Sequence, residues 1–215
     1  HGTQTMLEVV ENSCNPGFVH LGQQLGTDRL FDYITNFGFG KKTGIDLAGE
    51  GTGILFKKEN VGPVEQATTA FGQGVSVTPI QQVMAVSAAV NGGYLYEPYI
   101  VKRTINSETE EVIEERKPKE KQAVISEETS KQVREALEHV VAHGTGRPAY
   151  VDGYRVGGKT GTAQKVGEDG RYMTNSYIVS FIGFAPADDP SLVVYLAIDH
   201  PKNTVQFGGV VAAPI

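Results

Sequence analysis

The chain is poor in several features that would point to common classes of protein. It has a single cysteine, which excludes an internal disulfide and any zinc site built from several cysteines. Positive charge is not in excess, since 19 lysines and arginines stand against 25 aspartates and glutamates, for a net charge of −6. This balance argues against a nucleic-acid partner. No apolar run reaches the length of a membrane-spanning helix, and no signal peptide is recognisable.

The remaining composition is that of an ordinary globular protein. Of the 215 residues, 40% are hydrophobic and 20% are charged, which is enough for a sizeable core and argues against disorder. His139 and His143 are one helical turn apart, as in half of a metal site, but no glutamate lies between them to complete an H-E-x-x-H motif. We therefore expect a solvent-facing pair, and we expect neither a metal nor another cofactor.

Apolar periodicity and capping residues predict five helices. The first covers residues 5–12, the second carries Phe18 and ends at Gly26, and the third follows with residues 27 and 28 as its cap. A capping box at Thr78 predicts the start of a buried helix that ends at the Asn-Gly-Gly of residues 91–93. Ser126 is predicted to cap the last helix, which ends at Gly144.

Strand-like segments occur mainly in the second half of the chain. Residues 100–105 and 111–115 are predicted to form a hairpin, and residues 177–184 and 192–198 two apolar strands beside a strand at 157–163. The short connections predict three neighbouring antiparallel strands. The expected fold class is α+β, an antiparallel sheet flanked by helices.

The stretch at 157–163, Gly-Gly-Lys-Thr-Gly-Thr-Ala, combines a cation, two hydroxyls and small residues. The glycines are expected to leave the backbone open to a ligand, and the polar groups suit a carboxylate beside a polarised carbonyl. Residues 153–160 also fit the P-loop spelling GxxxxGK[ST]. That motif needs a helix after it. The glycine-rich sequence of residues 161–170 has no apolar repeat of helical period, so we set nucleotide binding aside.

A second motif lies far upstream, where Ser13-Cys14-Asn15 matches the pattern S-x-N. Penicillin-binding serine enzymes combine K-T-G with S-x-N and S-x-x-K. The sequences of residues 37–47 and of residues 71–74, Phe-Gly-Gln-Gly, are also similar to that family. The chain thus resembles the transpeptidase domain of a class B penicillin-binding protein, most of all the sporulation-specific type. The resemblance implies a penicillin-binding or serine β-lactamase-like fold, present here incompletely.

The resemblance also implies roles for the residues of both motifs. Ser13 would relay a proton between the lysine of the nucleophile and the leaving amine, and Asn15 would bind the backbone amide of a peptidoglycan stem peptide. Lys159 would supply positive charge. The hydroxyls of Thr160 and Thr162 would bind the terminal carboxylate of D-Ala-D-Ala or of a β-lactam antibiotic.

The same strand would hold the rest of the acyl donor. The amide of Thr162 would form half of an oxyanion hole. The substrate would lie along the strand edge as an added strand, at Gly161, Thr162, Ala163 and Gln164.

The motif that carries the serine nucleophile is missing from these 215 residues. None of the nine serines has a lysine three residues on, so no S-x-x-K motif is present. We expect residues 1–215 to be the C-terminal portion of one transpeptidase domain, without the nucleophile-bearing segment upstream and the final helix downstream. This piece alone is predicted to be inactive.

The intact protein is expected to be a D,D-transpeptidase that cross-links peptidoglycan. It would be anchored in the bacterial cell membrane, with its catalytic domain outside, and would work with other cell-wall synthesis proteins. Three alternatives stay open: a non-catalytic β-lactam sensor, a structural or binding domain of the same fold, and a β-lactamase or D,D-carboxypeptidase. Cys14 is either a small packing residue or one half of a redox lock with a cysteine outside the chain.

Overall fold

The computed structural model describes residues 2–215. Seven α-helices are present in this range: α1 (Met6–Glu11), α2 (Asn15–Leu25), α3 (Thr27–Asn36), α4 (Pro63–Ala70), α5 (Pro79–Val90), α6 (Glu127–His143) and α7 (Gly208–Val211). Two single 3-10 turns, η1 (Lys58–Asn60) and η2 (Arg147–Ala149), accompany them. The strands are β1 (Tyr94–Tyr96), β2 (Arg103–Ile105), β3 (Val112–Glu115), β4 (Glu120–Ala123), β5 (Gly157–Val166), β6 (Tyr172–Ala185) and β7 (Leu192–Asp199).

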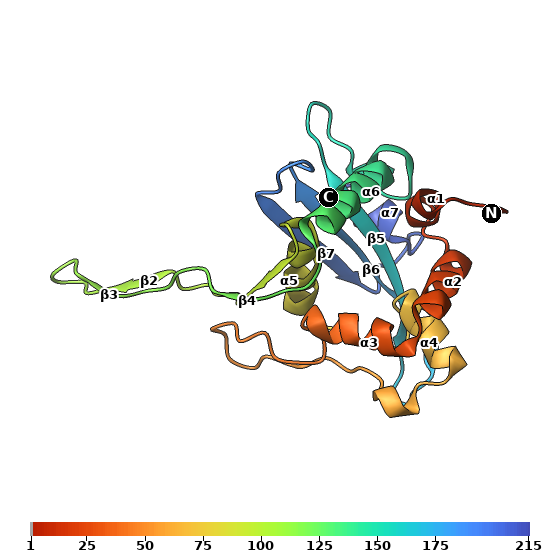
Figure 1. Cartoon of the computed structure of the whole chain (residues 1–215), viewed down its shortest axis with the longest axis horizontal. Coiled ribbons are helices and arrows are strands. Elements are labelled where there is room, and N and C mark those ends of the chain that lie inside the picture. The colour runs from red at the N-terminus through yellow and green to blue at the C-terminus, as the bar shows by residue number, and fades with distance from the viewer. Residues whose placement is uncertain (1) are drawn as a thin grey trace.

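The main sheet is three-stranded and antiparallel, in the order β5-β6-β7, as predicted. β5 and β6 are longer than expected and form a twisted hairpin whose register pairs Lys159 with Ile182 and Thr160 with Phe181. Figure 1 shows this sheet in the body of the molecule with helices packed around it. Because β5 pairs only with β6 within residues 2–215, its other edge carries no strand.

Two phenylalanines of β6 pack against the glycines at the start of β5. A Cβ atom on Gly157 would overlap the ring of Phe184, and one on Gly158 would overlap the ring of Phe181. Both glycines are buried. The sequence-based expectation that they open the backbone to a ligand is therefore wrong: they make room for core side chains.

The two rings anchor separate parts of the core. Phe181 packs with Val141 of α6 and with Ala212 and Ala213, which follow α7. Phe184 packs with Val90 of α5, while Leu137 of α6 packs against the same cluster. α6 thus contributes to both clusters and ties the helices to the start of β5.

Helix starts agree with the capping signals in two of the three cases. Thr78 and Gln81 form a reciprocal capping box at α5, with N–H donations of 2.9 and 3.2 Å, and Ser126 caps α6. The predicted cap at residues 27 and 28 is wrong, because Gly26 precedes α3 and supplies no side chain.

Between α5 and α6 the chain makes an excursion, the hairpin β2–β3, which extends away from the body (Figure 1). At its base, Asp46 accepts hydrogen bonds from the amides of Ile100 (2.7 Å) and Val101 (3.0 Å) and pairs with Arg116 at 3.1 Å. The amide of Ile100 is the main cause that lowers the pKa of Asp46. Where the excursion leaves the body, β1 pairs with β4, and the amide of Glu97 donates to the carbonyl of Lys119 at 2.9 Å.

Within residues 2–215, no helix combines the length and the apolar character needed to cross a membrane.

Candidate active site

Ser13 lies in the sharp corner between α1 and α2, as its sequence context predicted. Its φ of 50° is in the left-handed region, which is uncommon for a residue other than glycine. The amides of Ser13 and Cys14 donate to the carbonyls of Val10 and Val9, at 3.2 and 3.0 Å, and so close the end of α1. A Cβ on Gly17 would lie only 2.7 Å from the methyl groups of Val9, so a glycine there lets α2 pack closely on α1. The corner is held by backbone bonds and close packing.

Lys159 of β5 reaches this corner. Its Nζ donates to Ser13 Oγ at 2.8 Å and to the carbonyl of Thr160 at 3.2 Å. Burial lowers the pKa of Lys159 to about 8, so the group is mainly charged at neutral pH. Within residues 2–215, no carboxylate lies within ion-pair distance of this ammonium. Its charge is therefore available to an anionic ligand.

The two hydroxyls that follow on β5 already have partners. Thr160 Oγ1 donates to Thr145 Oγ1 at 3.2 Å, and Thr162 Oγ1 accepts from the amide of Gly208 at 3.1 Å. The Thr162 oxygen is only an acceptor in its bond, so its own proton remains free for an incoming oxygen. The sequence gives no sign of either Thr145 or Gly208. Thr145 stands just after the glycine that ends a helix, Gly208 belongs to a Gly-Gly pair, and neither pattern indicates a tertiary contact.

The other predicted site residues lie in the same two segments. Asn15 is the first residue of α2 and is exposed, and Cys14 beside it is buried. Ala163 is exposed on β5, whereas the side-chain amide of Gln164 donates to the carbonyl of Met173 at 2.9 Å within the β5–β6 hairpin. A Cβ on Gly161 would meet Ser180 Oγ at 2.5 Å, so that glycine serves sheet packing. The direct contact between the two motifs is the Ser13–Lys159 bond.

Neither the P-loop spelling nor the histidine pair forms the site that its pattern suggests in the described residues. Lys159 lies inside a strand that continues to Val166, so the helix that a P-loop requires after its lysine is not there. His139 and His143 are both exposed on α6 with ring centroids 5.5 Å apart. In the described part of the chain, no group of three or more histidine, cysteine, aspartate or glutamate side chains is placed to hold a metal ion.

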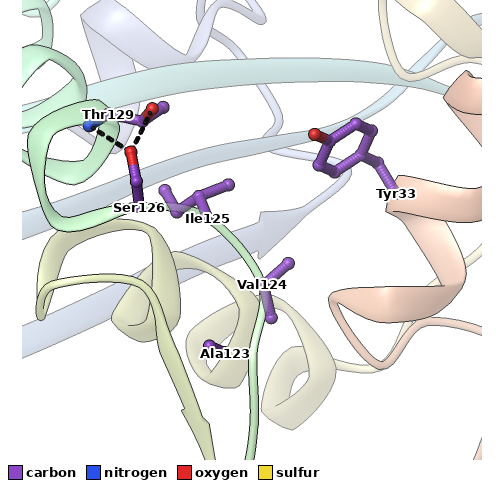
Figure 2. A pocket seen from close by; sticks show the side chains of 6 residues that line it. All are labelled: Tyr33, Ala123, Val124, Ile125, Ser126 and Thr129. Atoms are coloured by element: carbon purple, nitrogen blue, oxygen red, sulfur yellow. Dashed lines mark hydrogen bonds between the residues drawn. The ribbon is translucent and has the colours of Figure 1, made fainter.

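An open hollow of about 570 Å³ lies between α3 and the segment that leads into α6. Figure 2 shows Tyr33 across from Val124 and Ile125, with Ser126 hydrogen-bonded to Thr129. None of its lining residues belongs to either motif, and its Ser126 hydroxyl already caps α6. The hollow is therefore separate from the candidate active site.

Comparison with known proteins places this arrangement in a family. The family model "Penicillin binding protein transpeptidase domain" matches residues 1–215. The chain is 73% identical over 215 residues to stage V sporulation protein D of Bacillus subtilis strain 168, covering 100% of this chain and 33% of that protein. It is 34% identical over 207 residues to a probable peptidoglycan D,D-transpeptidase PenA of Neisseria meningitidis, covering 96% of this chain and 33% of that protein.

Solved structures give the same result. Penicillin-binding protein 3 of Mycobacterium tuberculosis, complexed with ampicillin, superimposes with a TM-score of 0.86 at 34% identity, over 92% of this chain and 45% of that chain. The transpeptidase domain of Burkholderia pseudomallei penicillin-binding protein 3 gives 0.86 at 33% identity, over 99% and 61%. The chain spans about a third of the length of the curated relatives that it matches. With the whole chain matched by the family model and the fold shared with these structures, the protein belongs to the penicillin-binding protein transpeptidase domain family.

Proposed function

We propose that the chain is the acyl-donor-binding and proton-relay part of a peptidoglycan D,D-transpeptidase. The observation that carries this proposal is the 2.8 Å bond between Lys159 Nζ and Ser13 Oγ, which joins the K-T-G and S-x-N motifs in one site. The names of the relatives support it, since several are called peptidoglycan D,D-transpeptidases. The serine nucleophile and its lysine base would lie outside these residues, because no serine here is followed by a lysine three positions on.

The geometry of the pair gives Ser13 a defined role in proton transfer. Since Lys159 donates to Ser13 Oγ, the hydroxyl proton of Ser13 is free to point elsewhere. Ser13 would pass this proton to the amine that leaves when the D-Ala-D-Ala amide bond breaks, and would take a proton from the lysine of the nucleophile. The charge of Lys159 would stabilise the nearby terminal carboxylate of the donor.

The free edge of β5 would receive the donor as an added strand. Thr160 and Thr162 would bind its carboxylate, with Gly161, Ala163 and Gln164 along its backbone. The Thr162 amide would provide half of the oxyanion hole. Asn15 would reach the stem peptide from the start of α2. A neighbouring structure with bound ampicillin and another with aztreonam support a β-lactam as an alternative ligand of this site.

The likeness to a stage V sporulation protein supports a role in spore cell-wall synthesis. The complete protein would be held at the bacterial membrane with this domain outside, beside other cell-wall synthesis proteins.

The test is labelling with a fluorescent penicillin, followed by mass spectrometry. The complete protein is expected to take one label and release it slowly, whereas the 215-residue chain alone forms no adduct. Fast release would indicate a β-lactamase or carboxypeptidase instead. Stable labelling without cross-linking of stem peptides would indicate a sensor. An adduct on Ser13 or Ser76 of the short chain would contradict the assignment of the motifs.

A further inference from the structure

The turn that follows α6, Gly144-Thr145-Gly146, touches both halves of the candidate site. The amide of Thr145 donates to the carbonyl of Glu11 at 3.0 Å. Glu11 is the last residue of α1 and stands two positions before Ser13. A Cβ on Gly144 would lie only 2.9 Å from the Cα atom of Glu11, so the turn and the end of α1 approach as closely as backbones can.

On its other side, the same turn contacts β5 and α7. The hydroxyl of Thr145 accepts from Thr160 Oγ1 at 3.2 Å. A Cβ on Gly209 would lie 2.7 Å from the carbonyl oxygen of Thr145, so α7 also packs closely on the turn. Through its amide and its hydroxyl, Thr145 joins the corner that carries Ser13 to the strand that carries Lys159.

We propose that Thr145 is a positioning residue for carboxylate recognition, which it supports through Thr160. This inference rests on the proposed transpeptidase function and assigns a new residue to that site. A carboxylate only accepts hydrogen bonds, so Thr160 can bind one only by donating its single hydroxyl proton. Without ligand, that proton is directed at Thr145.

Arrival of a carboxylate reverses the direction of this bond. Thr145 turns its own proton to Thr160 Oγ1, and the proton of Thr160 turns to the carboxylate, so no donor is lost and each oxygen stays paired. The chain of two hydroxyls also strengthens the terminal donor, because linked hydrogen bonds polarise one another. Without the Thr145 hydroxyl, the hydroxyl of Thr160 is free to rotate, and the ligand itself has to fix its orientation.

The experiment compares acylation of the complete protein by a penicillin and by its methyl ester, which lacks the carboxylate charge. Thr145→Val removes the hydroxyl at nearly constant shape, Thr145→Ser keeps it, and Thr104→Val on the exposed hairpin β2–β3 is the matched control. We expect Thr145→Val to raise the half-saturating concentration of the free acid about three- to tenfold, the factor of one hydrogen bond. The limiting acylation rate and the reaction of the ester stay unchanged, and Thr145→Ser and Thr104→Val behave as wild type.

A double-mutant comparison adds a second readout. In a Thr160→Val background, Thr145→Val should have no further effect, because its action passes through the Thr160 hydroxyl. If Thr145→Val does not fold, Thr145→Ala is used as the hydroxyl-free variant in the same comparison.

The outcomes separate this proposal from the proposed function. An equal loss for acid and ester, an additive double variant, or no loss in Thr145→Val overturns the positioning role, while a wild type that is stably labelled and cross-links stem peptides keeps the transpeptidase assignment. A complete wild-type protein that takes no label overturns the proposed function and, with it, the role of Thr145.

Discussion

The ammonium of Lys159 is 2.8 Å from the hydroxyl of Ser13, although 146 positions separate the two residues in the chain. Burial lowers the pKa of Lys159, and within residues 2–215 no carboxylate pairs with its ammonium. A positive group held in this way next to a hydroxyl is suited to bind an anion and to orient a proton transfer.

Replacing Lys159 by alanine in the complete protein should lower the rate of acylation by penicillin about 10²–10³-fold, as expected for a group of an electrostatic site. Lys165→Ala is the matched control, since that lysine lies six residues further along β5 and pairs with Asp199. The measurement is the second-order rate of labelling. Equal rates in wild type and Lys159→Ala would make β5 a purely structural strand.

The acylation rate should depend on the charge of Lys159. Because the pKa of Lys159 is about 8, the ammonium loses its proton as the pH rises through that value. We expect the penicillin acylation rate to fall above about pH 8, and Lys159→Arg to remove this fall because arginine stays charged. A wild-type profile that is flat from pH 7 to 10 would exclude the lysine as the titrating group.

Folding stability should rise with pH over the range in which the acylation rate falls. An unfolded lysine titrates near 10.4, so between about pH 8 and that value the unfolded chain holds more protons than the folded one. The free energy of unfolding therefore rises with pH between these two values. Below about pH 8 the buried ammonium lowers it by its full amount. Denaturant unfolding should show wild type gaining stability from pH 8 to 10 relative to Lys159→Met. Parallel profiles for the two proteins would contradict the lowered pKa.

Gly144→Ala should separate α6 from the Ser13 corner. The added methyl group would overlap the carbonyl of Glu11, and backbone atoms yield less easily than side chains. We expect a loss of about 1–3 kcal/mol in the free energy of unfolding, the usual cost of overpacking. Gly51→Ala is the control, because its Cβ would make only an ordinary contact of 3.7 Å with Thr78. Similar stability in both variants would show that the turn is free to shift.

Cys14 is expected to act as a packing residue, since its side chain is 9% exposed at the junction of α1 and α2. The complete protein should therefore be labelled by penicillin equally under oxidising and reducing conditions, as should Cys14→Ser. A loss of labelling that occurs only in oxidised wild type would instead support a redox lock between Cys14 and a cysteine outside these residues.

The sequence predicted the elements whose signals are local. Capping residues at Thr78 and Ser126 located the starts of α5 and α6, and two apolar runs located β6 and β7. α4 and the short strands β1 and β4 were not predicted. β4 is entirely exposed and mostly polar, and a strand of this kind exists only because a distant partner pairs with it.

For the site, the motif spelling identified Ser13 and Lys159 but could not show their contact. The meaning of Gly157 and Gly158 was misjudged because the rings they accommodate are more than twenty residues away in sequence. Thr145 was missed for a related reason. Its hydroxyl and amide act on two segments that are distant in the chain, and no local pattern records such a bond.

The excursion between α5 and α6 begins and ends at one point, because the Glu97 amide and the Lys119 carbonyl are already joined by a 2.9 Å bond. The outer stretch from 103 to 115 lies beyond the Asp46 contacts and is closed by the bond from the Arg116 amide to the Lys102 carbonyl, so it can be replaced at a small entropic cost. A fluorescent tag or an affinity peptide inserted at the turn between β2 and β3 would protrude from the body (Figure 1). Such a handle would allow the protein to be immobilised or tracked without altering β5 or the Ser13 corner.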